Sequence, residues 1–528
     1  MTTTLHRLPA RPDHRGFTRA LGAEWVKFRT GRGWVIGMLV AGLAIVALGL
    51  GPSSQGSCGM NGPASACTQT LGPGGEAVTD SFYLARQMLV GDGAITVRVT
   101  SLTGQIPDFS NAGDPNGPPK TQCGLVPWAK AGIIIKANLS QGSAYAAMMV
   151  TGGHGVRMQY DYTGDVAASP APGQAGPVSA ASPQWLRLVR TGDTVTGYDS
   201  ADGRHWARVA AVTLPGLPAT VQGGLFATSP PYDQLSAGQL DLNSGPSYAT
   251  GTFDQVSLEG GWHGHGWTGT VIGAPGGPAA GSPGSFADVG GRFTVTGTGD
   301  IAPSVAGAAG TGVTIAQTLI GVFAGLIAVA VIGAMFMTAE YRSGLIRVTL
   351  AAIPQRGQVL AAKAVVLAAV TFAVGLASSA IVVTLGPRVL RDHGVYVWPA
   401  TALTEIRVIV GTAAVLAVAA VIALALGTIL RRSAGAVAAV IVIIVLPYLL
   451  TVTTPLLPPG PTDWLARVTP AAAVAVQQTL IQYPQVADVY SPASGYYPLA
   501  PWAGFAVLCA WAAAALALAA YLLRRRDA

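Results

Sequence analysis

The sequence predicts an α-helical membrane protein with six transmembrane helices and a large all-β domain, of jelly-roll or sandwich type, between the first two helices. Half of the 528 residues are hydrophobic and only 10% are charged, against about a quarter in ordinary soluble domains. Charge-free apolar runs gather near the two ends of the chain, whereas the long segment between them shows short strand-like patterns. This composition argues against a wholly soluble enzyme and against an intrinsically disordered protein.

The first apolar run, 33–51, is long enough to cross a hydrocarbon core of about 30 Å as a helix. We interpret it as a retained signal-anchor helix. A cleaved signal peptide is the alternative, but the run exceeds the usual apolar region of roughly 7–15 residues and its basic leader, 1–32, is long. We place the other five spans at 312–338, 364–386, 408–430, 434–455 and 502–523. The alternative for these five runs is that they are buried helices of a large soluble core.

Basic residues are distributed unevenly among the segments that connect these spans. The N-terminal segment, the second and fourth connections and the tail 524–528 carry 16 basic and four acidic residues, whereas the opposite short loops carry four of each. The positive-inside rule therefore predicts a multi-pass plasma-membrane protein with both termini in the cytoplasm. The segment 52–311, with 11 basic and 16 acidic residues, and the loop 456–501 are then extracellular. The net charge of +7 thus reflects membrane orientation, and we expect no nucleic-acid partner.

Residues 80–262 show the pattern of an all-β domain. Alternation at 94–99 and 186–190 predicts strands with one buried face, and the apolar runs 131–136 and 144–150 predict strands buried on both faces. Glycine-containing turn signals recur between them. We interpret the flanking segments as an extracellular linker with a cysteine pair and as a Gly/Pro-rich linker or β appendage, at 52–79 and 263–311 respectively.

Several stretches of this domain resemble the concanavalin-like β-sandwich domains of secreted and surface proteins, namely 128–136, 149–159, 185–188, 198–206 and 253–256. Because such domains often bind glycans on aromatic platforms, the resemblance makes Trp128, Trp185 and Trp206 candidates for a ligand platform, with core packing as the alternative. His263 and His265 lack a third ligand, so we expect no metal site. No carboxylate pair has a spacing that demands glycosidase chemistry, and we expect no catalytic residues.

The cysteines agree with an external location for this segment. Cys58 and Cys67 flank a short segment just outside the first span, where disulfides persist. We favour a disulfide between these two, with Cys123 left over, although the other pairings of the three stay open. Cys509 lies in the last span, where we expect it to be inert.

The cytoplasmic connection 339–363 carries the most informative pattern. It reads E-Y-R-S-G-L-I-R from Glu340, followed by P-Q-R-G and a lysine at 363. We predict a short interfacial helix, a break and a renewed helix start. An ordinary charged loop is the alternative, but it does not explain the acid, the aromatic residue and the glycine placed among the arginines.

This connection resembles the loop between the second and third spans in permease subunits of ABC-2 type ABC transporters. The segment from Ala23 to Thr30 likewise resembles the amphipathic leader of that family. The resemblance covers about 15–51 and 312–526. The departure is the insertion 52–311, where the usual family loop is short, and it leaves the substrate open.

The resemblance implies a transporter subunit and not an enzyme. A separate ATP-binding cassette ATPase would dock on this connection through Glu340, Tyr341, Arg342, Gly344, Arg347 and Arg356. That ATPase would bind ATP and Mg²⁺, since the chain lacks a G-x-x-x-x-G-K-[ST] loop and is expected to bind no cofactor itself. A second permease copy, identical or related, would complete the path for export.

The leader would lie along the lipid membrane as an amphipathic helix, with Trp25 and Phe28 on one face and Lys27 and Arg29 directed at lipid phosphates. Its interface residues would be Glu24, Trp25, Lys27, Phe28 and Arg29. Two other functions stay open at this point. One is a membrane-anchored glycan- or wall-binding protein, and the other is an integral-membrane enzyme with an external catalytic domain.

Overall fold

In the computed structural model the chain divides into two compact units. The helical unit comprises Met1–Thr68, Ala309–Ile481 and Tyr490–Ala528, and the β unit comprises Gln69–Ala308 and Gln482–Val489. The structure describes residues 14–55, 69–109, 120–169, 178–235, 242–273, 284–305, 312–352, 355–452, 459–486, 490, 492 and 495–525. The predicted disulfide between Cys58 and Cys67 lies outside these residues.

Six helices of the described chain are long and apolar enough to cross a membrane, which confirms the number and order of the predicted spans. The first is Arg32–Gly51 of α2 (Arg32–Gln55), and the fifth is the continuous run Ser433–Leu450. The other four are α4 (Gly321–Arg342), α6 (Arg356–Asp392), α7 (Ala402–Leu430) and α11 (Pro501–Arg525). Both α6 and α7 extend beyond the segments that the apolar runs predict, because their ends carry charged residues.

The fifth span is irregular. It combines α8 (Ser433–Val440), a π-helical turn (Ile441–Val445) and α9 (Leu446–Val452). Pro447 lacks a backbone N–H and cannot continue the ordinary hydrogen-bond ladder, which is a common setting for a locally widened helix. The irregularity therefore has a local cause in the sequence.

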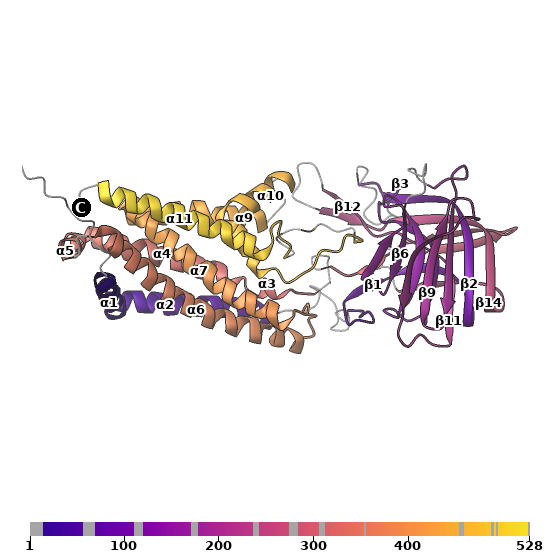
Figure 1. Ribbon diagram of the computed structural model, residues 1–528, viewed down its shortest axis with the longest axis horizontal. Helices are drawn as coiled ribbons and strands as arrows, with labels where there is room; N and C mark the ends of the chain where they lie inside the picture. Colours follow the sequence, from indigo (N-terminus) through magenta and orange to yellow (C-terminus); the bar gives the residue numbers. More distant parts are fainter. Residues whose placement is uncertain are drawn as a thin grey trace, which may run out of the picture. The chain divides into compact units, whose positions relative to one another are not determined.

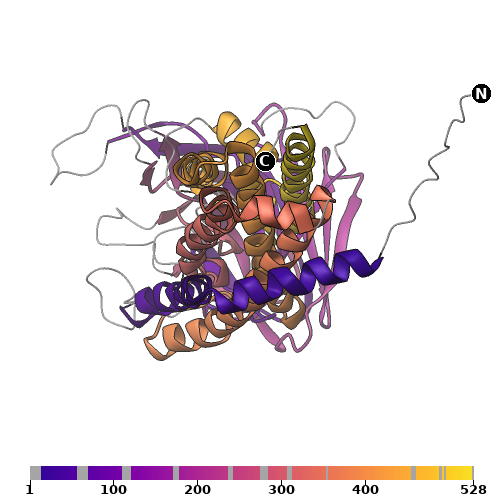
Figure 2. The ribbon, with the colours of Figure 1, turned by 90° about the vertical axis from the view of Figure 1, so that its left-hand side faces the viewer.

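Shorter helices complete the helical unit. The leader forms α1 (His14–Thr30), which runs across the end of the bundle instead of along α2 (Figures 1 and 2). The predicted loop 456–501 contains two helical segments, α10 (Pro459–Val468) and the 3-10 helix η3 (Pro470–Gln477). The remaining two are α3 (Ile315–Thr318) and α5 (Leu345–Ala352).

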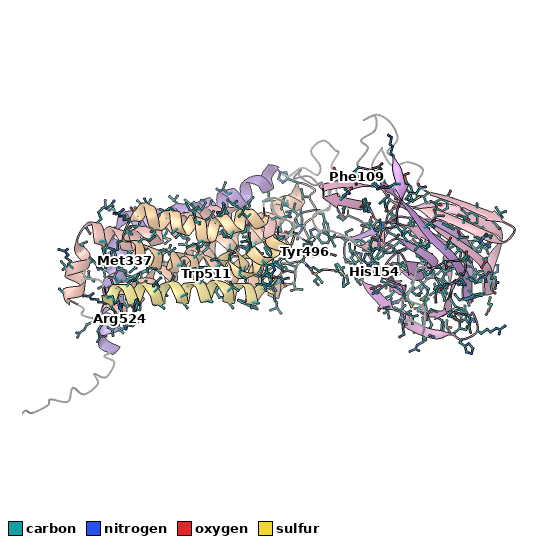
Figure 3. The ribbon with its side chains drawn as sticks, turned by 90° about the horizontal axis from the view of Figure 1, so that it is seen from above. Phe109, His154, Met337, Tyr496, Trp511 and Arg524 are labelled. Carbon is teal, nitrogen blue, oxygen red and sulfur yellow. The ribbon has the colours of Figure 1, made fainter. Side chains whose placement is uncertain are left out.

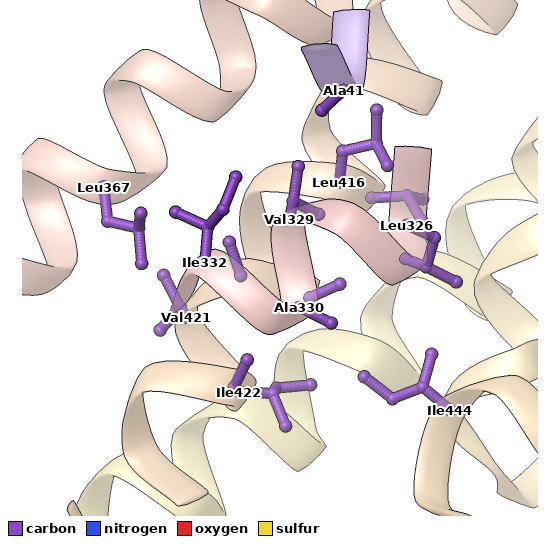
Figure 4. Packing of buried hydrophobic residues seen from close by; sticks show 14 of the residues in the cluster. Ala41, Leu326, Val329, Ala330, Ile332, Leu367, Leu416, Val421, Ile422 and Ile444 are labelled. Atoms are coloured by element: carbon purple, nitrogen blue, oxygen red, sulfur yellow. The ribbon is translucent and has the colours of Figure 1, made fainter. Parts of the chain in front are cut away.

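The core of the helical unit lies between α4 and α7, where Val329 and Ala330 face Leu416 and Ile422 (Figure 4). Small residues allow these two helices to approach closely. A Cβ atom added at Gly333 would lie 2.6 Å from the carbonyl oxygen of Ala420. Close backbone approach is the usual way in which membrane helices gain packing contacts without a hydrophobic driving force.

Two long antiparallel strands, β2 (Phe82–Pro107) and β14 (Tyr248–Ile272), form the frame of the β unit (Figure 1). The first half of β2 also pairs with β11, and its second half pairs with β8. The two long strands therefore belong to both halves of one large sheet, ordered β10-β9-β8-β2-β11-β4-β5-β6-β7. Contacts of β4 and β5 with β8 show that the halves pack face to face.

The other strands of this sheet are β3 (Thr121–Cys123), β4 (Lys130–Lys136), β5 (Tyr145–Thr151), β6 (Val156–Tyr160), β7 (Gly164–Ala167), β8 (Gln184–Thr191), β9 (Thr194–Ser200), β10 (Ala207–Thr213), β11 (Thr220–Thr228), β15 (Gly284–Val289) and β16 (Arg292–Gly297). Two further pairs stand apart, β1 (Val78–Asp80) with β17 (Ile301–Pro303) and β12 (Tyr232–Leu235) with β13 (Leu242–Gly245). The prediction of an all-β domain is confirmed. A concanavalin-like strand order stays a prediction.

The central strands β4 and β5 are buried at every residue, which confirms the two-faced burial predicted from their apolar runs. One face packs in the core between the two halves of the sheet, and the other lies in a second cluster with Phe82, Phe226 and Ile301. The second cluster includes residues of β1 and β17, so this pair covers the outer face.

The structure draws one predicted boundary differently. The segment 263–311, predicted as a linker or a β appendage, holds β structure from its first residue, because β14 continues to Ile272 and β15 and β16 join the same sheet. The Gly and Pro content of this segment lowered its apparent strand character. Its described part, up to 305, belongs to the β unit.

Candidate functional site

The predicted short helix and break after the second span are present. α4 ends at Arg342, and Gly344 adopts a left-handed conformation (φ 71°) that turns the chain into α5. Glycine suits this position because a side chain there would be strained. α6 then begins at Arg356. The location of α5 at a membrane interface stays a prediction.

This turn lies at one end of the bundle, together with other arginines. The Arg431 guanidinium lies 5.1 Å from the centroid of the Tyr341 ring. Arg356 donates a hydrogen bond of 2.8 Å to the carbonyl oxygen of Leu523. Figure 3 places Met337 of α4 and Arg524 of α11 at this same end. We call it the basic end, with Arg29, Arg342, Arg347, Arg356, Arg431, Arg432, Arg524 and Arg525.

A group of four charged residues lies at the basic end, three of them buried and Lys27 half-buried, and we call it the ion-pair cluster. The Lys363 Nζ atom lies 2.6 Å from Glu24 Oε2 and 2.6 Å from Glu340 Oε1. The Lys27 Nζ atom lies 2.9 Å from Glu24 Oε1 and 3.1 Å from Glu340 Oε1. The two lysines and two glutamates balance in charge, as buried ions require.

The ion-pair cluster connects three helices that are far apart in sequence. Glu24 and Lys27 lie on α1, Glu340 on the last turns of α4, and Lys363 on the first turns of α6. The Lys363 ammonium also lies 4.6 Å from the centroid of the Phe336 ring. The leader is thus attached to the second and third spans by charge pairs.

The cluster also reaches α5, because Lys27 Nζ donates a hydrogen bond of 3.2 Å to Thr349 Oγ1. Glu340 Oε2 is buried and accepts no hydrogen bond from the part of the chain that the structure describes. A buried carboxylate oxygen without a donor has a free-energy cost. The unpaired oxygen of Glu340 therefore lowers the stability that the ion-pair cluster contributes.

The pKa of Lys27 is raised above its ordinary value of 10.5: burial lowers it, but the hydrogen bond and charge of Glu24 and the charge of Glu340 together outweigh burial. A raised pKa of a base means that its ion pairs contribute stability below about pH 10.5 and lose it as the pH rises through the folded-state value. We expect the difference in unfolding temperature between wild type and Lys27→Met to be constant near neutral pH and to shrink above about pH 10.5.

Thermal unfolding of both proteins in the same detergent checks this expectation. Arg29→Met, at an exposed neighbour on α1, serves as the matched control, and its difference from wild type should not change over this range. A difference for Lys27→Met that persists unchanged at strongly alkaline pH would contradict the assignment.

The structure separates the residues predicted to contact an ATPase by their exposure. Arg342, Gly344 and Arg347 are exposed, whereas Tyr341 and Arg356 are half-buried. Glu340 is only 8% exposed and bonds both lysines of the ion-pair cluster. Its contact with a partner stays a prediction, and it would require these ion pairs to open.

The leader differs from its prediction. Phe28 is 3% exposed and its ring packs edge-on against Phe336, whereas Trp25 is 47% exposed, so the two do not share a face. Lys27 bonds Glu24 and Glu340. Sequence reasoning treated the leader as an isolated helix and did not foresee that Glu24 and Phe28 form one inward stripe at helical spacing. The location of the leader at a lipid membrane stays a prediction.

The aromatic candidates in the β unit are not equivalent. Trp128 is 6% exposed, with its ring stacked on His154 at 3.9 Å, so it packs in the structure and cannot form a surface platform. Trp185 and Trp206 are half-buried. Among the described residues no group of three or more His, Cys, Asp or Glu side chains could hold a metal ion.

Sequence reasoning missed the pairing of Glu24 with Lys363. A signal was available, because an acid in an otherwise basic leader and a lysine at the start of an apolar span both need a partner once they are buried. The sequence spacing of 339 residues gave no indication that they meet.

Comparison with known proteins bears on the C-terminal half of the chain, which holds five of the six spans and the last part of the β unit. A family model described as ABC-2 family transporter protein matches residues 252–528, more than half of the chain. The chain belongs to the ABC-2 family of transporter proteins. Members of this family are membrane components of transporters, in agreement with the six apolar helices of this ABC-2 protein.

Other comparisons add little to this ABC-2 assignment. No curated protein matches the chain. One similar solved structure is a functionally unknown protein from Saccharomyces cerevisiae, with 15% sequence identity and a TM-score of 0.20. The match covers 34% of this chain and 75% of that chain. A likeness at this TM-score supports no argument about fold or function.

Proposed function

We propose that the chain is the permease subunit of an ABC transporter, energised by a separate ATP-binding subunit that docks on the basic end. The family match supports the transporter class. The observation that carries the docking site is the exposed surface of the turn and of α5. Leu345 and Val348 are 54% and 68% exposed, with the exposed cations Arg342 and Arg347 beside them in sequence.

An exposed apolar pair flanked by cations suits a groove on a protein with acidic edges. Charged groups at the edge of such an interface chiefly guide association and select the partner, while the apolar residues supply the buried area. In this proposal Lys363 does not contact the ATPase, and Glu340 does so only when its ion pairs open. Both residues transmit the movement of the ATPase, because the ion-pair cluster links α4 to α1 and α6.

The transport path is formed with a second permease copy, and the proposed direction is export. The middles of the six spans carry no Asp, Glu, Lys or Arg, which favours apolar or lipid-like cargo over a proton-coupled mechanism. The β unit is extracellular in this proposal, in keeping with the charge asymmetry of the short loops. It binds cargo or a surface glycan there.

Charge reversal of Arg342 and Arg347 tests the docking site. The variant Arg342→Glu/Arg347→Glu should weaken binding of the ATP-binding subunit at least about tenfold and abolish its stimulated ATP hydrolysis, because the substitutions place like charges at the interface edge. Copurification and ATP hydrolysis by the reconstituted complex are the measurements.

Arg524→Glu/Arg525→Glu is the matched control, since it removes the same charge from the basic end at exposed positions outside α5. The control should bind and stimulate the ATPase as wild type does. Docking on α5 is ruled out if the Arg342/Arg347 variant, correctly inserted in the membrane, behaves like this control.

A further inference from the structure

The chain passes between the helical unit and the β unit four times. The first and second passages are the ends of the long insertion, at 68/69 and 308/309. The third and fourth are the two ends of the segment Gln482–Val489, which lies between η3 and α11 in sequence but belongs to the β unit. An insertion into a single loop needs only two passages, so the other two require their own explanation.

Gln485 attaches this segment within the β unit. The residue is 3% exposed, and its Nε2 atom donates hydrogen bonds of 3.2 Å to the carbonyl oxygen of Thr163 and 3.5 Å to that of Tyr162. Tyr483 lies in the same segment. Burial raises the pKa of Tyr483, and the nearby carboxylate of Glu76 raises it further.

The carbonyl oxygens that Gln485 binds belong to an unusual turn between β6 and β7. Asp161 and Tyr162 both have positive φ angles, 42° and 62°, although neither is a glycine. A left-handed conformation at two consecutive non-glycine residues is unfavourable and persists only where surrounding contacts fix it. Asp161 Oδ1 accepts the N–H of Tyr145 at 3.2 Å, and the Gln485 amide donates to the carbonyl oxygens of Tyr162 and Thr163.

The same turn is joined to the first and second passages. The Tyr162 hydroxyl donates a hydrogen bond of 2.7 Å to Asp80 Oδ2. Asp80 is the last residue of β1, which follows the first passage, and it pairs with Ile301 of β17, which precedes the second. Residues of β1, of β17 and of the segment that holds Gln485 therefore meet around Tyr162.

We propose that the segment 482–486 is a tether that couples the connection before α11 to the β6–β7 turn, so that a displacement of this connection shifts Tyr162, and a displacement of Tyr162 shifts this connection. Only the source of the displacement, ATP-driven movement of the spans, rests on the proposed function. The tether itself is independent of any ATPase. Coupling between two sites is reciprocal, so perturbing either side must loosen the other.

Hydrogen exchange of the full-length protein in lipid nanodiscs, followed by mass spectrometry, tests the tether from both sides. Gln485→Ala should speed exchange of the amides at 160–164 by about tenfold, because the turn loses two buried hydrogen bonds. Tyr162→Phe, which removes only the hydroxyl, should speed exchange at Tyr483, Gln485 and Val486 by at least about threefold.

Matched controls exist for both variants. Gln478 lies in the same connection and its Nε2 donates a 3.2 Å hydrogen bond to the carbonyl oxygen of Leu480, within the helical unit. Gln478→Ala should leave exchange at 160–164 unchanged, and Tyr198→Phe on β9 should leave exchange at 482–486 unchanged.

The proposal is overturned if either Gln485→Ala or Tyr162→Phe gives the same exchange as its control. Neither measurement uses the ATP-binding subunit. If the proposed permease function is wrong, only the docking experiment will show it, and the hydrogen-exchange test of the tether will keep its meaning.

Discussion

Replacing Lys363 by methionine is expected to destabilise the helical unit by about 3–5 kcal/mol, because the substitution leaves two buried carboxylates without their shared cation. The side chain of Lys363 is fully buried, and those of Glu24 and Glu340 are 3% and 10% exposed. Lys27 cannot take over alone, since its own side chain is 38% exposed and reaches the cluster from the solvent side.

We expect the destabilisation by Lys363→Met to arise because Glu24 and Glu340 stay buried and charged without a cation. Loss of the ion-pair attraction itself should contribute little. The triple variant Lys363→Met/Glu24→Gln/Glu340→Gln removes the buried negative charges as well and should recover most of the lost stability, because neutral groups of similar volume often replace a buried ion pair at little cost. Arg347→Met, at an exposed position, is the control and should stay within about 0.5 kcal/mol of wild type.

Thermal unfolding of the purified proteins in one detergent gives the comparison. A Lys363→Met protein that unfolds at the temperature of the Arg347→Met control would contradict the structural role of the ion-pair cluster. A triple variant no more stable than Lys363→Met would show that the lysine contributes through packing on Phe336 and not through charge.

Replacing Lys136 by methionine should have a similar effect on the β unit. The Lys136 Nζ atom lies 2.7 Å from Asp80 Oδ2 and donates hydrogen bonds of 3.1 Å to the Tyr162 hydroxyl and to the carbonyl oxygen of Ser143. Neither side chain of the pair is exposed. Burial lowers the pKa of Lys136, and the charge of Asp80 opposes this shift.

We expect Lys136→Met to lower the stability of the β unit by about 3–5 kcal/mol and the double variant Lys136→Met/Asp80→Asn to restore much of it. Calorimetry of the full chain measures the effect, with the transition of the β unit identified by loss of exchange protection in β4. Lys120→Met is the control, because Lys120 is exposed. Equal transitions for Lys136→Met and this control would refute the prediction.

The membrane spans could be predicted from the sequence because their signal is local. Each span is a run of apolar residues long enough to cross a bilayer, and no distant contact is needed to recognise it. The same holds for β4 and β5, whose apolar runs indicate burial on both faces. In both cases the free energy gained by burying the apolar run favours the predicted structure, whichever residues it packs against.

The misses all depend on contacts between distant residues. The inward stripe of α1 is set by Phe336 and Lys363, which lie more than 300 residues away in the sequence. The choice between a ligand platform and core packing stayed open for Trp128, because its burial depends on how the turn that carries His154 folds over it. Gln485 gave no sign from its sequence context that it belongs to the β unit.

The pairing of β1 with β17 explains how so large an insertion can occupy a connection between two membrane helices. Val78 lies opposite Pro303 in this pair, and facing residues of antiparallel strands are only about 5 Å apart. The two ends of the insertion are thus held together by its own backbone hydrogen bonds. The spans on either side therefore bear almost none of the loop-closure entropy of the segment, which in any case grows only slowly with length. A bundle that tolerates a short loop at this position would therefore also tolerate the whole β domain. Evolution or protein engineering could likewise replace the β domain by another domain whose two termini lie close together.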